Sequence, residues 1–167
     1  MSAKLKLLKR KRLLLMIGSC MYLLLTGFSA TAQISVNTLQ NLSFGAFSHG
    51  NSGGTVVIAA NGARSVTGDV IPVNLGFQYY PAIFEVEAPS GTIINIVNGP
   101  DVQLTGSNGG SMTLHIGASD PASPFTSTTT PPAKNSIKVG ATLTVGGPAA
   151  NPPGVYSGSF SVTFIQE

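Results

Sequence analysis

One five-residue segment has the spacing of a hydrolase nucleophile. Gly50-Asn51-Ser52-Gly53-Gly54 fits the Gly-x-Ser-x-Gly pattern, and His49 stands beside it as a candidate base. In that motif a strand leads through a sharp turn into a helix, which exposes the serine hydroxyl. Residues 55–60 follow directly and are short and apolar, so they predict a strand and not a helix. We therefore interpret the pattern as a coincidence in a glycine- and serine-rich chain, and no catalytic residue is predicted.

Metal-binding chemistry has few candidates. Two histidines are too few for most zinc sites, and His115 alternates onto the face opposite the apolar residues of segment 112–116. Calcium needs only oxygen ligands, but Asp69, Asp101 and Asp120 lack the spacing of a calcium-binding loop. Each aspartate is expected to be a solvated turn residue, so neither a metal site nor a cofactor is predicted.

Glu85 and Glu87 are the most closely spaced carboxylates. They share one face of a predicted strand and lie roughly 7 Å apart, a spacing that could serve glycoside hydrolysis. Catalysis would require burial of one carboxyl to raise its pKa, and the neighbouring residues offer little cover. We interpret the pair as solubilising charges, and the protein is predicted not to be an enzyme.

Tyr79 and Tyr80 are the strongest candidates for ligand contacts. Exposed tyrosines stack on sugar rings or fill a pocket of a protein partner with little loss of side-chain entropy. In the alternative interpretation, Phe77 and Tyr79 pack inward and Tyr80 alone is free, since aromatic residues at strand edges are common in cores. In the ligand-contact interpretation, the partner would be a glycan or an envelope protein.

The charges divide into two unlike parts. Six of the nine basic residues lie within the first twelve positions, and all six acidic residues lie beyond them. Residues 33–167 therefore hold three basic and six acidic residues, a net charge of 3 − 6 = −3. Three scattered cations cannot neutralise a run of phosphates, so no nucleic-acid partner is expected.

A secretory signal peptide is predicted over residues 1–32. A basic start, an apolar run over 13–28 and small residues near Ala32 follow the usual order, and they place the cleavage between Ala32 and Gln33. The alternatives are an uncleaved anchor, for which the apolar run is short, and a lipoprotein attached through Cys20, although the chain stays apolar after that residue. The cleaved protein would have no cysteine and no transmembrane segment. It would reside in the periplasm, on the cell surface or outside the cell.

Residues 33–167 alternate between apolar and polar with period two, which predicts a single all-β domain. Asn61-Gly62 predicts a hairpin between strands at 55–60 and 64–73, and the clean alternation of 156–164 predicts one full-length last strand. The proline-rich segment 118–132 predicts a mobile surface loop. About eight or nine short strands favour an antiparallel β-sandwich over a membrane barrel, which would need aromatic girdles.

Six segments, taken in order, resemble a family of exported bacterial domains known as domain of unknown function 4402. They are Leu42-Ser43-Phe44-Gly45-Ala46-Phe47, Gly53-Gly54-Thr55-Val56-Val57-Ile58, Gly62-Ala63-Arg64-Ser65-Val66-Thr67-Gly68, Pro81-Ala82-Ile83-Phe84-Glu85-Val86, Val139-Gly140-Ala141-Thr142-Leu143-Thr144-Val145 and Gly154-Val155-Tyr156-Ser157-Gly158-Ser159-Phe160-Ser161-Val162. The resemblance implies an exported immunoglobulin-like sandwich with no catalytic residues to carry over. The closing Gly-x-Tyr-x-Gly-x-Phe segment is also similar to the last strand of pilus-type subunits, although the end at 164–167 departs from the family's aromatic finish.

Two functional hypotheses follow. The first is a structural or adhesive surface protein that self-associates by lending an edge strand, because the surface is rich in Ser, Thr and Asn and the stretch 34–38 could pair with another chain. The second is a monomeric exported module that binds a glycan or an envelope protein through Tyr79, Tyr80 or the 118–132 segment.

Overall fold

The computed structural model describes residues 33–167, so the predicted signal peptide with Cys20 and Ala32 lies outside the described residues. The described chain forms thirteen strands. They are β1 (Ser35–Gln40), β2 (Ser43–Phe44), β3 (Phe47–Ile58), β4 (Arg64–Pro72), β5 (Tyr79–Tyr80), β6 (Ala82–Glu87), β7 (Ile93–Asn98), β8 (Val102–Gly106), β9 (Ser111–Asp120), β10 (Phe125–Thr126), β11 (Asn135–Val145), β12 (Tyr156–Ser157) and β13 (Val162–Gln166).

The all-β prediction is confirmed. Residues 33–167 contain no helix, and therefore none with the length and hydropathy needed to cross a bilayer. Nine of the strands have five or more residues, and β2, β5, β10 and β12 have two residues each. The nine longer strands match the predicted number, whereas the short pairings depend on partners distant in the sequence.

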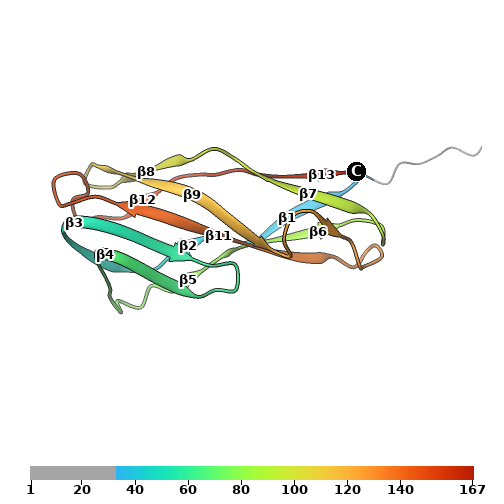
Figure 1. The fold of residues 1–167 in the computed structure, drawn as a ribbon, viewed down its shortest axis with the longest axis horizontal. Helices are drawn as coiled ribbons and strands as arrows, with labels where there is room; N and C mark the ends of the chain where they lie inside the picture. Colours follow the sequence, from blue (N-terminus) through green and yellow to red (C-terminus); the bar gives the residue numbers. More distant parts are fainter. Residues whose placement is uncertain (1–32) are drawn as a thin grey trace, which may run out of the picture. The chain divides into compact units, whose positions relative to one another are not determined.

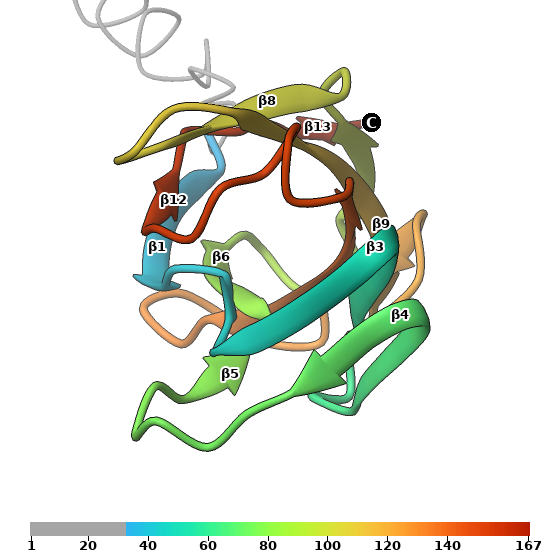
Figure 2. The same ribbon diagram turned by 90° about the vertical axis from the view of Figure 1, so that its left-hand side faces the viewer.

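The largest sheet is organised around β11. One edge of this strand pairs with β6 over residues 135–139 and then with β3 over residues 141–145, while its other edge pairs with β9. The sheet continues from β6 to β1, from β3 to β4, and from β9 through β8 to β12, which makes eight strands. Figure 2 shows this sheet curling around the core instead of lying flat.

A three-stranded sheet in the order β10-β7-β13 packs against one end of the larger sheet (Figure 1). The ring of Phe164 on β13 meets the ring of Phe84 on β6 edge to face, with centroids 5.5 Å apart. Buried side chains on the inner faces of both sheets form one core, in which alternate residues of β11 from Ile137 to Val145 are fully enclosed. The period-two pattern of the sequence therefore reports burial correctly.

The predicted hairpin is confirmed. β3 and β4 pair in register from Ile58↔Arg64 to Gly54↔Gly68, and the chain reverses at Asn61-Gly62. Gly62 has a φ of +88°, a conformation that favours glycine, and the Asn61 side chain accepts a hydrogen bond from the backbone N–H of Ala63 at 3.0 Å. Local turn chemistry thus suffices to position this pair of strands.

The prediction of one unbroken last strand over 156–164 is wrong. β12 pairs with β8 in the large sheet, β13 pairs with β7 in the small sheet, and the chain crosses between them at residues 158–161. The alternation persists through the crossing, because Tyr156, Phe160 and Phe164 are half-buried while the intervening serines are exposed. Alternation therefore recorded which side chains face the core, but it could not record which sheet each part joins.

The prediction of a continuous surface loop over 118–132 also needs correction. Residues 118–120 complete β9 and pair with β11 through Ser119↔Val139 and Asp120↔Lys138. Residues 125–126 form β10 on β7, and the following Ser127 is almost completely buried. The Ser127 hydroxyl donates to the carbonyl oxygen of Ala88 at 3.1 Å, so this segment is fastened to the sandwich.

Gly140 lies where the partner of β11 changes from β6 to β3, and we predict that Gly140→Ala destabilises the fold. A Cβ there would lie 2.5 Å from the carbonyl oxygen of Ile58, a backbone atom that cannot rotate away. We expect a loss of about 1–3 kcal/mol in urea-induced unfolding, as for other overpacked cores.

The matched control is Gly117→Ala on the neighbouring strand β9. Its nearest contact would be the Gly140 carbonyl oxygen at 3.3 Å, so a small shift accommodates the methyl group. Equal effects of the two substitutions would contradict a specific role for the close approach at Gly140.

Candidate functional site

The two predicted contact tyrosines form the short strand β5. This strand pairs with β2 through Ser43↔Tyr80 and Phe44↔Tyr79, so it is anchored beside the buried Phe44. Tyr79 is 42% exposed and Tyr80 is 38% exposed. Both rings are therefore accessible to a partner, as the ligand-contact prediction requires.

Arg64 holds this region together, and sequence reasoning missed it. Its guanidinium lies 4.2 Å from the centre of the Tyr79 ring, and Nη1 donates to the carbonyl oxygens of Phe44 and Ala46, each at 3.2 Å. A cation over an aromatic face is attracted by the ring quadrupole. One face of Tyr79 is therefore occupied, although its side chain stays slightly more exposed than that of Tyr80. Arg64 is the first charged residue after position 32, a signal that could have identified it.

An exposed apolar surface extends from the tyrosines, and we call it the 71–80 surface. Its large side chains are Ile71, Leu75, Phe77, Tyr79 and Tyr80. Leu75 and Phe77 are both 69% exposed, so the alternative in which Phe77 packs inward is wrong. No charged residue occurs between Asp69 and Glu85 in the sequence, and the Arg64 guanidinium lies against this surface at Tyr79. Exposed apolar clusters of this kind are typical of contact sites.

The segment with hydrolase-like spacing lies in a β-bulge. The register of β3 against β4 passes from His49↔Val70 to Gly54↔Gly68, so residues 50–53 of β3 face the single residue Asp69. The Asp69 carboxylate accepts the backbone N–H of Ser52 at 2.9 Å, and the Nε2 atom of His49 lies 2.9 Å from the carbonyl oxygen of Asn151. The strand, turn and helix of a nucleophile motif are not formed here, in agreement with the sequence interpretation.

His115 and Asp101 meet on the outer surface. The Nδ1 atom of His115 on β9 lies 2.7 Å from Oδ1 of Asp101, the residue before β8, and both side chains are more than half exposed. Within residues 33–167 no three His, Cys, Asp or Glu residues are close enough to hold a metal ion. The Asp101–His115 contact is thus an exposed polar pair without a third ligand.

The predicted alternation of β6 is confirmed, since Phe84, Val86 and Ala88 are buried while Glu85 and Glu87 face outward. Glu85 receives a hydrogen bond from the Lys134 ammonium at 2.8 Å. This hydrogen bond, together with the charge of Glu85, raises the pKa of Lys134 above its ordinary 10.5. Glu85 is therefore engaged in a surface ion pair, and the arrangement does not set the two carboxylates around a common reacting group.

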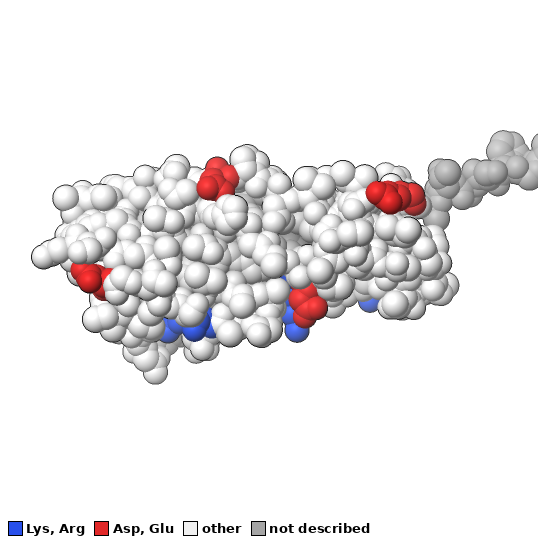
Figure 3. Space-filling view, in the orientation of Figure 1, with Lys and Arg blue, Asp and Glu red and all other residues white. Residues whose placement is uncertain are grey.

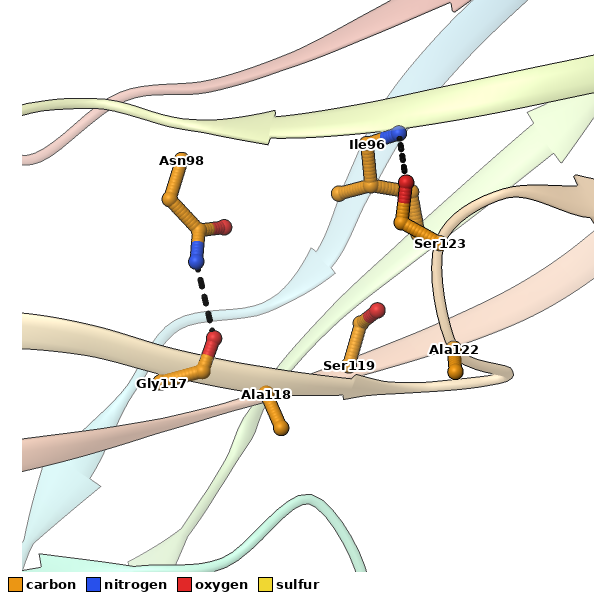
Figure 4. A pocket seen from close by; sticks show the side chains of 7 residues that line it. All are labelled: Ile96, Asn98, Gly117, Ala118, Ser119, Ala122 and Ser123. Atoms are coloured by element: carbon orange, nitrogen blue, oxygen red, sulfur yellow. Dashed lines mark hydrogen bonds between the residues drawn. The ribbon is translucent and has the colours of Figure 1, made fainter.

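A shallow pocket of about 270 Å³ opens between β7 and β9, as Figure 4 shows. The Asn98 amide points from β7 to the carbonyl oxygen of Gly117 on β9 at 2.8 Å, and the Ser123 hydroxyl accepts the backbone N–H of Ile96 at 2.7 Å. Its lining carries no charged side chain. The first contact joins β7 to β9, two strands that do not pair through their backbones, and the second joins β7 to the segment between β9 and β10.

Comparison with protein families gives one match, to the domain of unknown function DUF4402, over residues 34–165. The match covers nearly all of the described chain. The protein belongs to the DUF4402 family. Comparison with curated proteins and with solved structures found no match. The resemblance noted from the six sequence segments is thereby confirmed.

The DUF4402 domain of this protein displays few charges. Figure 3 shows small, separated groups of acidic and basic side chains on a face that is otherwise uncharged. The candidate histidines, aspartates and glutamates are dispersed over different strands and loops. The 71–80 surface is the feature of this DUF4402 domain that gathers exposed aromatic and aliphatic groups, and its chemistry suits non-covalent contact.

Arg64→Ala is predicted to loosen β5 and lower stability. The substitution removes the donor to the Phe44 and Ala46 carbonyl oxygens and the cation above Tyr79, and hydrogen bonds from a charged group are worth about 1.5–3 kcal/mol. Urea unfolding followed by tyrosine fluorescence measures the loss, since the chain has no tryptophan.

Arg64→Lys is the companion variant. It keeps the positive charge but loses the planar fork, so an intermediate stability is expected. If Arg64→Ala unfolds at the same urea concentration as the unaltered protein, the proposed anchoring of β5 is incorrect.

Proposed function

We propose that this protein is an exported, non-enzymatic structural or adhesion-type protein of the cell surface or envelope, and that it self-associates through its β-strands. The observation that carries the proposal is the exposure of the side chains of β1. This strand has exposed side chains at every position from Ser35 to Leu39, and Gln40 is half-buried. It is held by its backbone pairing with β6 and by the Gln40 amide on the Pro81 carbonyl oxygen at 2.9 Å.

A strand of this kind can engage another molecule at low cost. No side chain of β1 belongs to the buried core, so neither its release nor the addition of a neighbour to it disturbs the packing of the sandwich. Within residues 33–167 no strand pairs with its outer edge, and unpaired backbone groups on a sheet edge accept further strands. The scarcity of charge across residues 33–167 supports close association between molecules.

The test is deletion of residues 35–40 in the full chain, which keeps the residues flanking the predicted cleavage site. Export by a bacterial host, extraction in mild detergent and comparison of boiled with unboiled samples on a denaturing gel measure assembly. The unaltered protein should give a ladder of multiples that collapses on boiling to the mass of residues 33–167. The deletion should remove the ladder and leave the melting temperature within a few degrees, because no buried side chain is lost. A persistent ladder in the deletion variant would exclude β1 from assembly.

The 71–80 surface favours a second candidate function, a monomeric exported module that binds a glycan or an envelope protein. Tyr80 and Phe77 present aromatic rings to solvent, and Leu75 extends the apolar area beside them. Aromatic side chains of this exposure give large contact area with little loss of entropy on binding.

For this candidate, Phe77→Ser combined with Tyr80→Ser should abolish retention on immobilised envelope glycans or envelope proteins. The melting temperature should stay nearly unchanged because both rings are already exposed. Val155→Ser is the control, since Val155 is 72% exposed and lies outside the 71–80 surface. Equal retention of all three proteins would remove the 71–80 surface from consideration as the contact site.

A further inference from the structure

The terminal strands of the two main sheets differ in how they are protected from pairing. In the large sheet these strands are β1, β4 and β12, and in the small sheet they are β10 and β13. β10 and β12 have two residues each, while β4 carries Arg64, Asp69 and Pro72 and lies against the bulge of β3. Short length, charge, proline and bulges are the devices that keep sheet edges from pairing with other chains. β1 and β13 contain neither charge nor proline, and the register of β1 shifts only near its end, between Thr38 and Gln40, so residues 35–38 and β13 are the least protected edges.

The free edge of β13 is regular. The Gly99 N–H donates to the Ser161 carbonyl oxygen and the Glu167 N–H donates to the Ile93 carbonyl oxygen, at 2.9 and 3.0 Å. These two bonds fix the hydrogen-bonded pairs of the β7–β13 ladder at the odd-numbered residues of β13. The N–H and C=O groups of Val162, Phe164 and Gln166 therefore point away from β7, toward a position that no strand of the described chain occupies.

At the side of the sandwich where β13 has its free edge, one face of β1 is also uncovered. Val36 is paired with Val86, so the two side chains lie on the same, core-facing side of the large sheet. Val86 is fully buried, but Val36 is 40% exposed. The small sheet ends at β13, whose Phe164 covers Phe84 on β6, and it provides no strand above β1. Figure 1 shows β1 and β13 at the same end of the domain.

We infer that a second copy of this chain closes the open side of the sandwich at β1 and β13, with β1 of one copy adding to the free edge of β13 of the other. A strand placed on β13 would lie over Val36, and β1 is an uncharged, extended strand whose own outer edge is free. Each copy carries one edge of each kind, so the contact can repeat from one copy to the next, as a ladder of multiples requires, and each contact covers the Val36 of one copy. Neither β1 nor β13 itself contains a charged residue. The inference rests on the proposed self-association and deepens it by naming the two edges.

The test places a charge on the β13 edge of the full chain. Ile165 and Val97 are directly comparable, since both are 47% exposed on the outer face of the small sheet, Ile165 on the edge strand and Val97 on the central strand β7. Ile165→Glu should raise the dissociation constant in sedimentation velocity at least about tenfold, because a charge at a paired edge opposes strand addition. Val97→Glu should change it much less.

A complementary variant tests the identity of the partner strand. Asn37 lies on the outer face of β1 opposite Glu85, where Asn37→Lys introduces a compatible charge. Mixing Ile165→Glu with Asn37→Lys should restore association between the two proteins, because a β1 lysine then meets a β13 glutamate. Circular dichroism melting of each variant confirms that it is folded.

The outcomes separate the two claims. If the unaltered protein stays monomeric at every concentration, the proposed self-association fails and the inference fails with it. If it associates but Ile165→Glu and Val97→Glu behave alike, the β13 edge is not used and the inference alone is overturned. If Ile165→Glu dissociates and the mixture does not recover, β13 meets a strand other than β1, which also overturns the inference.

Discussion

The fold depends on the two-sided pairing of β11. This strand hydrogen-bonds to β6 and then to β3 on one edge and to β9 on the other, and its alternate side chains from Ile137 to Val145 fill the centre of the core. Without it, the β1–β6 and β3–β4 pairs would have no common partner. Gly140 stands at the change of partner, where the Ile58 carbonyl oxygen leaves no space for a Cβ. This single strand of 11 residues thus joins segments that span most of the described sequence.

Each sheet is bounded by edge strands, and these edge strands differ in how well they are protected from further pairing. The β4 edge carries charge and proline that protect it from further pairing, whereas β1 and β13 lack both. The same low charge that leaves these edges open also keeps the 71–80 surface apolar. Open sheet edges and exposed apolar surface are features that physical chemistry connects with association between molecules.

The sequence predicted what depends on neighbouring residues. Asn61-Gly62 specifies its own turn, and the alternation of β6 separates Phe84 and Val86 from Glu85 and Glu87, so both features could be read locally. The break in the last strand could not be predicted, because it depends on whether β8 or β7 lies alongside, and both pair with residues that are fifty or more positions away in the chain. The alternative in which Phe77 packs inward is wrong for the same reason. Alternation shows on which face of a strand a side chain lies, but not whether another strand covers that face.

The candidate site follows the same division between local and distant causes. Tyr79 and Tyr80 could be found from their type and from the following proline, but the cation above Tyr79 comes from Arg64 on β4 and reaches β2 as well. That contact makes the two tyrosines unequal, because Tyr79 belongs partly to the structure that anchors β5, whereas no such cation lies over Tyr80. A ligand-contact surface assigned from the sequence therefore has to be reassessed once the packing is known. A side chain that holds its own strand in place is not free to rearrange for contact with a partner.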